Sequence, residues 1–501
     1  MKEIVEPTDW KSDPCTLRRE APSLRQLALD SPDTLIVTPS NQFYAFIRQE
    51  YNEYNRQTEP LAIVLPRSID QLRQAVVYCS GHMPPIPMTI RGGGHDPYGR
   101  TVEPSAAQID LRYFKWINIL ESKPSSSTAT EKAVAVGPGI TAIEMHRALD
   151  GAGLSAATGW AGSVGVVGWS CGGGYGLSSG AWGMGVDNIL GAKVMQADGR
   201  IRDTRDDPDL LWAMRGAGQG NYGIIVELRI RVRPKPRYIA GTLVFSLQHA
   251  VKVLSGFQAL LDEGLPTNFG GEMTINTTDA LGPAINLYFT WICDSHSDAH
   301  VADGMNFKEK LLWRLQLAPL VDTVSETSTL AFHETLNQGI ADSQHGYWDM
   351  ASLTLARLTP EVIGVIMRNP APTGGASAIL VHHIHGRAVQ PDDTASWSHR
   401  REHYVVSPCA IAPLDASPRQ KQVTREWTQV IYREMLQTGQ ALRKGYWSMS
   451  RPENCDAIDF YGIDTVKRLT KLKQKLDPSN VFPFGLPRFN AKESQDERAH
   501  I

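Results

Sequence analysis

The chain contains 501 residues, and its 50 lysines and arginines nearly balance 53 aspartates and glutamates, leaving a formal net charge of −3 at pH 7. This balance provides no electrostatic footprint for nucleic acid, and no apolar run is long enough to cross a membrane. The length is ample for two domains with large hydrophobic cores. We therefore expect a chain that binds neither nucleic acid nor membranes.

Six cysteines are spread along the sequence without the dense spacing of a disulfide framework or a C-x-x-C metal pair. We therefore expect no metal site. The first ten residues are acidic and lack the apolar core of a secretory signal peptide. On this basis we expect the protein to be intracellular and cytoplasmic.

The first half of the chain predicts short strands that alternate with capped helices. Segments 68–71 and 141–144 carry the capping-box pattern and precede apolar residues at helical spacing. Asp207-Pro208 predicts the start of a third helix. Strands are predicted around Ile63, over 134–136 and around Val194. This mixture favours an α+β fold.

The segment Arg91-Gly92-Gly93-Gly94-His95 follows a predicted strand over 88–90. Successive N–H groups of glycine-rich backbone can form a nest for phosphate oxygens, and Arg91 would add positive charge. A histidine held beside such a nest is a competent nucleophile or metal ligand. Taken alone, the motif also fits a glycine turn followed by a surface histidine.

Two further glycine-rich segments favour a ligand-binding role for this motif over a simple glycine turn. Residues 158–176 hold eight glycines together with Trp160 and Trp169, unlike a flexible linker. Residues 216–223 run directly into a β-branched strand over 224–232. Three such turns beside strands suggest one extended ligand lying along one domain. Gly137-Pro138-Gly139 superficially suits a Rossmann fingerprint, but no strand ending in an acidic residue follows at the required distance.

Beyond the prolines of segment 233–236 the pattern changes to candidate strands with intervening helices. These strands are expected at 239–247, 272–277, 285–293, 351–358 and 376–385, and a helix is expected over 251–263. A helical stripe through Val466 and Leu476 ends at Asp477-Pro478 and predicts a return of the chain to the first domain.

The chain resembles the berberine-bridge-enzyme-like flavin-linked oxidoreductases of the vanillyl-alcohol-oxidase superfamily, which carry a PCMH-type FAD domain. The matching segments are 60–66, 91–99, 159–176, 186–188, 220–224 and 477–482. The resemblance implies an N-terminal segment (1–56), an FAD-binding domain (57–236), a substrate domain with an antiparallel sheet backed by helices (237–440), and a C-terminal return (441–501).

By this resemblance the cofactor is FAD, joined covalently to His95 through the flavin 8α-methyl carbon. Members of the family often add a cysteinyl bond, but the matching position here is Ala161, which predicts a link through His95 only. Cys171 is expected to be a buried small hydrophobe. The expected cofactor contacts are Arg91, Gly92, Gly93, Gly94, His95, Tyr98, Gly99, Gly159, Ser163, Gly165, Gly168, Trp169, Gly173, Gly176, Gly223 and Ile225.

The resemblance implies hydride removal from a substrate carbon to flavin N5, with reoxidation by molecular oxygen in oxidase members. We expect a small, hydrophobic or phenolic secondary metabolite as substrate, with oxidative cyclisation as one outcome. A flavin-containing cyclase or isomerase without net redox chemistry is the alternative. A non-catalytic flavin-binding protein is a third interpretation, which the large substrate domain disfavours.

The catalytic base is less well indicated. The family's Tyr-x-Asn-Tyr motif corresponds here to Tyr446, followed by Ser448 and Met449 in place of the asparagine and second tyrosine. Candidate replacements are His383 and His385, which share one face of a predicted strand, whereas His382 points oppositely. A half-exposed strand with polar side chains explains the same histidines without catalysis.

Overall fold

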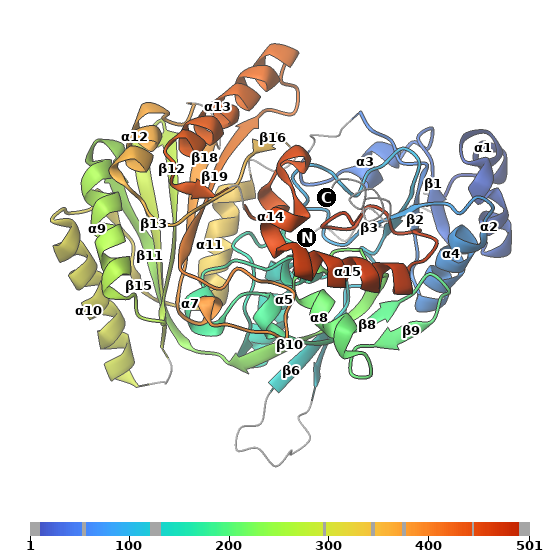
Figure 1. The fold of residues 1–501 in the computed structure, drawn as a ribbon, viewed down its shortest axis with the longest axis horizontal. Helices are drawn as coiled ribbons and strands as arrows, with labels where there is room; N and C mark the ends of the chain where they lie inside the picture. Colours follow the sequence, from blue (N-terminus) through green and yellow to red (C-terminus); the bar gives the residue numbers. More distant parts are fainter. Residues whose placement is uncertain are drawn as a thin grey trace, which may run out of the picture.

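The computed structural model describes residues 11–52, 57–120, 132–293, 297–341, 346–372, 377–442 and 445–489. Within these residues the protein has the predicted α+β fold, with three sheets that lie side by side and helices packed around them (Figure 1). Two sheets belong to the half of the molecule that carries the glycine loops, and the third forms the other half.

The first sheet has the strand order β1-β2-β4-β3, in which β2, β4 and β3 are parallel, and α4 carries the chain back from the end of β2 to the start of β3. Strands β2 and β4 are buried along their whole length, as strands covered on both faces are. The elements of this part are α1 (Pro14–Glu20), η2 (Pro22–Leu24), α2 (Arg25–Asp30), β1 (Leu35–Val37), α3 (Tyr44–Arg48), β2 (Ala62–Leu65), α4 (Ile69–Gly81), β3 (Met88–Arg91) and β4 (Ala107–Asp110).

The second sheet has the order β5-β6-β10-β8-β9, with β7 paired to β10. Helix α5 begins with the predicted capping box, in which the Glu144 carboxylate accepts a hydrogen bond from the Thr141 backbone N–H at 3.0 Å. The elements are β5 (Ile117–Leu120), β6 (Lys132–Val136), α5 (Ala142–Gly151), β7 (Leu154–Ser155), α6 (Val166–Cys171), α7 (Ser179–Trp182), η3 (Val186–Asn188), β8 (Ile189–Met195), β9 (Ile201–Asp203), α8 (Pro208–Ala217) and β10 (Ile224–Pro234).

The third sheet begins at β11, directly after the prolines at 234 and 236, and is antiparallel throughout its described pairs. Its strands are β11 (Arg237–Ser246), β12 (Phe269–Thr278), β13 (Gly282–Cys293), β14 (Val321–Asp322), β15 (Ser325–Thr327), β16 (Tyr347–Met350), β17 (Leu353–Leu355), β18 (Ala378–Ile384), β19 (His403–Ala412) and β20 (Ala441–Leu442). Every residue of β19 except one is buried, so this strand lacks the alternating pattern that marks a half-exposed strand in a sequence.

Helices cover one face of this sheet, and the other face is directed toward the first two sheets (Figure 1). Their apolar sides form one core with alternate residues of the strands, such as Met273 and Ile275 of β12 and Val381 of β18. The covering helices are α9 (Ala250–Glu263), α10 (Asp298–Leu315), α12 (Pro360–Arg368) and α13 (Pro418–Gln437), and α11 (Thr329–Ala341) instead contacts α5.

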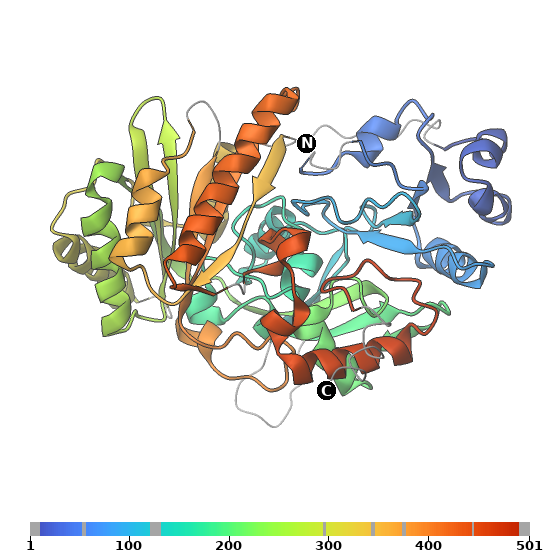
Figure 2. The ribbon, with the colours of Figure 1, turned by 45° about the horizontal axis from the view of Figure 1, so that its top comes forward.

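The chain then returns to the first half of the molecule through α14 (Ala457–Tyr461) and α15 (Ile463–Leu476). Leu469 and Leu472 of α15 are buried, and α15 lies beside α8 (Figure 2). Phe482 continues into the core of the first sheet. None of the described helices is both long and apolar enough to cross a membrane.

Candidate active site

A cavity of about 560 Å³ lies between the glycine-rich loops and the uncovered face of the third sheet. Its walls come from segments far apart in the sequence: the turn after β3, the loop before α6, the turn before β10, and strands β12, β18 and β19. The predicted residues that line it are Gly92, Gly93, Gly94, His95, Gly159, Gly165, Gly168, Trp169, Gly223, Ile225 and Tyr446. The fold thus gathers three separate glycine segments around one space.

Two of the glycine loops touch backbone to backbone. A Cβ added to Gly93 would lie 2.6 Å from the Cα and N of Gly165, and one added to Gly165 would lie 2.8 Å from the N of Gly93. Atoms of real side chains do not approach backbone so closely, so both positions require glycine for space. This contact holds the His95 loop against the loop that carries Ser163.

His95 lies at one wall of the cavity and is held from two sides. Its Nε2 lies 3.1 Å from Ser163 Oγ, and its ring stacks on Tyr51 with centroids 3.7 Å apart. Burial away from bulk water lowers the pKa of His95 to about 4, because a charged imidazolium would be poorly solvated there. At neutral pH the ring is therefore the uncharged form, which carries a nucleophilic lone pair.

Arg91 does not line the cavity. Its guanidinium is buried and donates to Asp110 Oδ2 at 3.1 Å and to the Ile47 carbonyl at 2.8 Å. The positive charge expected to help a phosphate nest is therefore neutralised beneath the loop, where it fixes the end of β3 to β4. The sequence spacing could not reveal this, because Asp110 is brought opposite Arg91 only by strand pairing.

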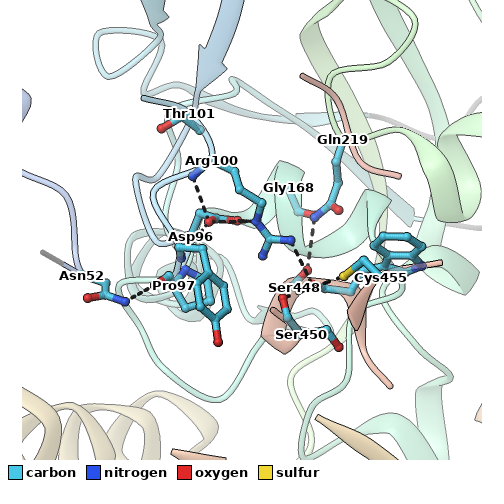
Figure 3. Close-up of polar contacts among 12 residues, drawn as sticks. Asn52, Asp96, Pro97, Arg100, Thr101, Gly168, Gln219, Ser448, Ser450 and Cys455 are labelled. Atoms are coloured by element: carbon cyan, nitrogen blue, oxygen red, sulfur yellow. Dashed lines mark hydrogen bonds and ion pairs between the residues drawn. The ribbon is translucent and has the colours of Figure 1, made fainter. Parts of the chain in front are cut away.

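Arg100 supplies a positive charge to the cavity, although no motif of the sequence marks it as a site residue. Its Nε donates to Asp96 Oδ2 at 2.9 Å and its Nη1 to the Trp447 carbonyl at 3.2 Å, whereas its buried Nη2 has no hydrogen-bond partner among the described residues. Nearby, Gln219 bridges the Gly168 carbonyl at 2.8 Å and Ser448 Oγ at 3.3 Å (Figure 3). A buried unpaired donor of this kind fits an acceptor on a bound molecule.

The other expected contacts lie behind the cavity wall. The Tyr98 hydroxyl accepts from the Met350 backbone N–H at 3.1 Å, and Gly99 turns the chain with a φ of +58°. Gly173 packs on Trp397 and Gly176 on the Thr158 carbonyl. Ser163 reaches the site through His95. Cys171 is fully buried, as predicted, and burial raises its thiol pKa to about 12.

The structure does not bring His383 and His385 to the cavity. The His383 ring packs against Phe257 and Phe269, with centroids 5.0 and 5.6 Å away, and His385 Nε2 lies 3.0 Å from the Phe269 carbonyl. Burial lowers the pKa of both rings, so neither is charged at neutral pH. The alternation that put them on one face is observed, but that face is the one the helices cover.

His382, on the other face of β18, lines the cavity instead. Its Nδ1 lies 2.8 Å from Glu272 Oε1 of the neighbouring strand β12. The rest of this wall is mostly apolar and aromatic. It is formed by Trp160, Thr274, Asn276, Tyr288, Trp348, Met350, Ala378, Leu380, Cys409 and Ile411.

Tyr446 and Tyr175 lie together in the cavity wall with ring centroids 4.8 Å apart. The Tyr175 hydroxyl lies 3.1 Å from His403 Nε2, and His403 Nδ1 lies 2.6 Å from the Arg401 carbonyl. Because Nδ1 must donate to that carbonyl, Nε2 accepts the tyrosine proton. Burial raises the pKa of both phenols, so both stay protonated at neutral pH.

The residues around this cavity suit a large cofactor that has a planar ring system and phosphate groups. A Cβ added to Gly168 would meet nothing within 4 Å, so the backbone of α6 opens directly onto the space. The unpaired Arg100 Nη2 offers a cationic donor, and glycine backbone at 92–94 allows close approach. The fold and the site therefore define a flavin-nucleotide-binding enzyme.

Comparisons with known proteins agree with this class. Residues 60–205 match a family model described as an FAD binding domain. The chain is 30% identical over 470 residues to the FAD-linked oxidoreductase aurO of Gibberella zeae, covering 92% of this chain and 87% of that protein. It is 33% identical over 414 residues to (R)-6-hydroxynicotine oxidase of Paenarthrobacter nicotinovorans, covering 79% and 84%.

Solved structures share the same fold. The 6-hydroxy-D-nicotine oxidase of Arthrobacter nicotinovorans superposes with a TM-score of 0.77 at 19% identity, over 91% of this chain and 97% of that one. BBE-like 1 of Physcomitrella patens gives 0.77 at 19% identity, over 92% and 97%. The chain belongs to the FAD-linked oxidoreductases, and it shares its fold with structures of berberine-bridge-enzyme-like proteins, which agrees with the resemblance drawn from its sequence.

Proposed function

We propose that the protein oxidises a small, hydrophobic or phenolic metabolite by two electrons, using FAD bonded covalently to His95 alone. The observation that carries this proposal is the shape of the site: one cavity joins the glycine loops and His95 to an aromatic wall on the third sheet. When bound, the flavin supplies an acceptor for the substrate's hydride, and the wall positions the substrate carbon.

The environment of His95 supports covalent attachment through one particular nitrogen. If Nε2 carries the proton and donates to Ser163 Oγ at 3.1 Å, Nδ1 keeps the lone pair that a bond to the flavin 8α-methyl carbon would require. That carbon would lose a proton, and the flavin ring would itself accept the two electrons. The pKa of about 4 keeps this ring neutral at physiological pH. Ala161 lines the cavity without a thiol, so a second bond from that position is impossible.

The composition of the wall supports a substrate without a carboxylate. Among the described residues that line the cavity, Arg100 is the only lysine or arginine, and Asp96 already pairs with it. A carboxylate substrate would therefore lack a dedicated partner at the aromatic wall. A relative of the chain is named (R)-6-hydroxynicotine oxidase, and hydroxynicotine carries no carboxylate.

An acid-precipitation experiment tests the covalent link. The pellet of the purified wild-type protein should be yellow because the flavin stays attached, and the pellet of His95→Ala should be colourless while the native variant still binds FAD. A colourless wild-type pellet would contradict the covalent claim.

The cyclase or isomerase alternative rests on Met449, which lines the cavity at the position where the resemblance implies a tyrosine. Anaerobic mixing with 6-hydroxynicotine and a panel of simple phenols separates the two functions. Bleaching of the flavin absorbance supports hydride transfer, whereas product formed without bleaching supports chemistry with no net oxidation.

A further inference from the structure

One row of ionisable side chains crosses the cavity wall of the third sheet. Strand pairing places Tyr288 of β13 opposite Glu272 of β12, and Glu272 opposite His382 of β18. Residues paired in this way point to the same face of a sheet. His382 and Tyr288 line the cavity, so the row faces the cavity and not the core that the helices cover.

His382 and Glu272 form a nearly buried histidine–carboxylate pair within this row. His382 Nδ1 lies 2.8 Å from Glu272 Oε1, and the two side chains are only 12% and 8% exposed. A carboxylate this close to Nδ1 favours a proton on that nitrogen and a lone pair on Nε2. Neither ring nitrogen makes a hydrogen bond among the described residues, so Glu272 acts on His382 through the charge of its carboxylate.

Packing alone gives no reason for Glu272. Burying a carboxylate costs free energy that its single imidazole partner only partly offsets, and an apolar residue in its place would be at least as stable. The next residues of β12 on the face of Glu272 are Thr274 and Asn276, which line the cavity and carry no charge. A buried carboxylate beside a histidine that lines a cavity is typical of a site that stabilises an imidazolium ion.

The rival proton acceptors in the cavity are less suitable. Tyr446 and Tyr175 keep their protons at neutral pH because burial raises their pKa values, and the Tyr175 hydroxyl is already engaged with His403. Met449 has no ionisable group. The Tyr175 ring, which also lines the cavity, is stacked beside His382 with a centroid distance of 6.4 Å.

We propose that His382, beside the Glu272 carboxylate, accepts the proton from the hydroxyl group of a phenolic substrate. The substrate's O–H bond would break as an N–H bond forms at Nε2, and a C–H bond of an sp3 carbon attached to the phenol ring, ortho or para to the hydroxyl, would break with its electron pair leaving as hydride to a bound flavin. The oxidised substrate would then be a quinone methide. The substrate thus loses one proton and one hydride, and the positive charge gained by His382 lies against the Glu272 carboxylate. This inference rests on the proposed function, because it requires a bound flavin as the electron acceptor.

A chromogenic phenol tests the proposal without knowledge of the natural substrate. The holoenzyme is titrated with 4-nitrophenol, whose anion is yellow, and the absorbance change is followed against pH after subtraction of the flavin spectrum. Proton transfer to His382 should make the bound phenol ionise about one pH unit or more below the free phenol, a tenfold shift in its ionisation constant. The titratable groups that surround His382 are Glu272, Tyr288, Tyr175 and, behind the sheet, His383.

His382→Gln keeps a hydrogen-bonding side chain that cannot be protonated, so the bound phenol should ionise as it does in solution. Glu272→Gln should remove most of the shift while leaving His382 in place. His249→Gln, at the start of α9, is the matched control and should behave as the wild type. Flavin absorbance and melting temperature, measured first for each variant, establish that it is folded holoenzyme.

Identical ionisation in the wild type and His382→Gln would overturn the proposal, and so would failure of 4-nitrophenol to bind the wild-type holoenzyme. Either result leaves the flavin function intact if the flavin is present and reducible. A wild-type protein without flavin would instead contradict the proposed function itself.

Discussion

At the scale of single residues, the chemistry of the site depends on hydrogen bonds that select one form of a side chain. His95 is kept neutral by burial and is oriented by Ser163, and His403 is held in one tautomer by the Arg401 carbonyl. His382 Nδ1 lies 2.8 Å from a carboxylate on the neighbouring strand. In each of the three rings, the surroundings of one nitrogen favour the form in which the other nitrogen carries its lone pair or its proton.

Ser163→Ala should slow or reduce covalent attachment of FAD without abolishing binding. The hydroxyl that orients the His95 ring would be lost, so the attacking nitrogen would be less often available. The covalent fraction, measured as flavin retained in acid-precipitated protein, should fall several-fold, and Ser163→Thr should restore it. An unchanged covalent fraction in Ser163→Ala would show that Tyr51 and the loop backbone alone position the ring.

Much of this residue-level information is readable in the sequence, because the glycines and His95 are adjacent in the chain. Arg100 was the missed signal, although it lies only five positions after His95. Arg100 matters because its buried Nη2 has no hydrogen-bond partner among the described residues. The placement of its guanidinium depends on the hydrogen bond from Nη1 to the Trp447 carbonyl, which comes from a distant part of the chain.

At the scale of elements, the site is held together by close contact between backbone segments. Gly93 and Gly165 bring the turn after β3 against the loop before α6, and their contact leaves no room for a methyl group. The predicted elements of the first half are present in the structure, whereas β19 and helices α10, α12 and α13 were not anticipated. Strand β19 is buried on both faces, and so it shows no period of two.

Gly165→Ala should weaken FAD binding strongly and lower the melting temperature. Its φ of −67° is ordinary for any residue, so the added methyl group acts only through the clash with Gly93. We expect a destabilisation of about 1–3 kcal/mol, as in overpacked cores, and mostly flavin-free protein after purification. Gly151→Ala at the end of α5, where a Cβ meets nothing within 4 Å, is the control and should bind flavin normally. Full flavin content in Gly165→Ala would contradict the close packing of the loops.

At the scale of the whole molecule, several histidines are buried in neutral form. Burial lowers the pKa of His333 and of His403 to about 4, and the two side chains belong to residues that are 4% and 1% exposed. In the unfolded chain the same groups titrate near 6.5. Between these values the unfolded state binds more protons than the folded state, so stability must fall as the pH falls.

The free energy of unfolding should therefore decrease between about pH 6.5 and pH 4, by up to about 1.4 kcal/mol per pH unit for each such histidine. Urea unfolding at a series of pH values measures this slope. His333→Gln should make the slope shallower by about one proton, although the variant itself will be less stable at neutral pH. A slope that is the same in the wild type and in His333→Gln would show that His333 is protonated in the folded protein.

The sequence by itself determined the family, the cofactor and the α+β class, because glycine motifs and His95 are local patterns whose chemistry depends on neighbouring residues. It also determined that His382 points away from His383 and His385, since a strand alternates its side chains. Only the tertiary structure decided which of those faces meets the cavity. That choice depends on where helices α9 and α12 pack, and on Glu272 being paired across from His382, and both are contacts between residues far apart in the chain.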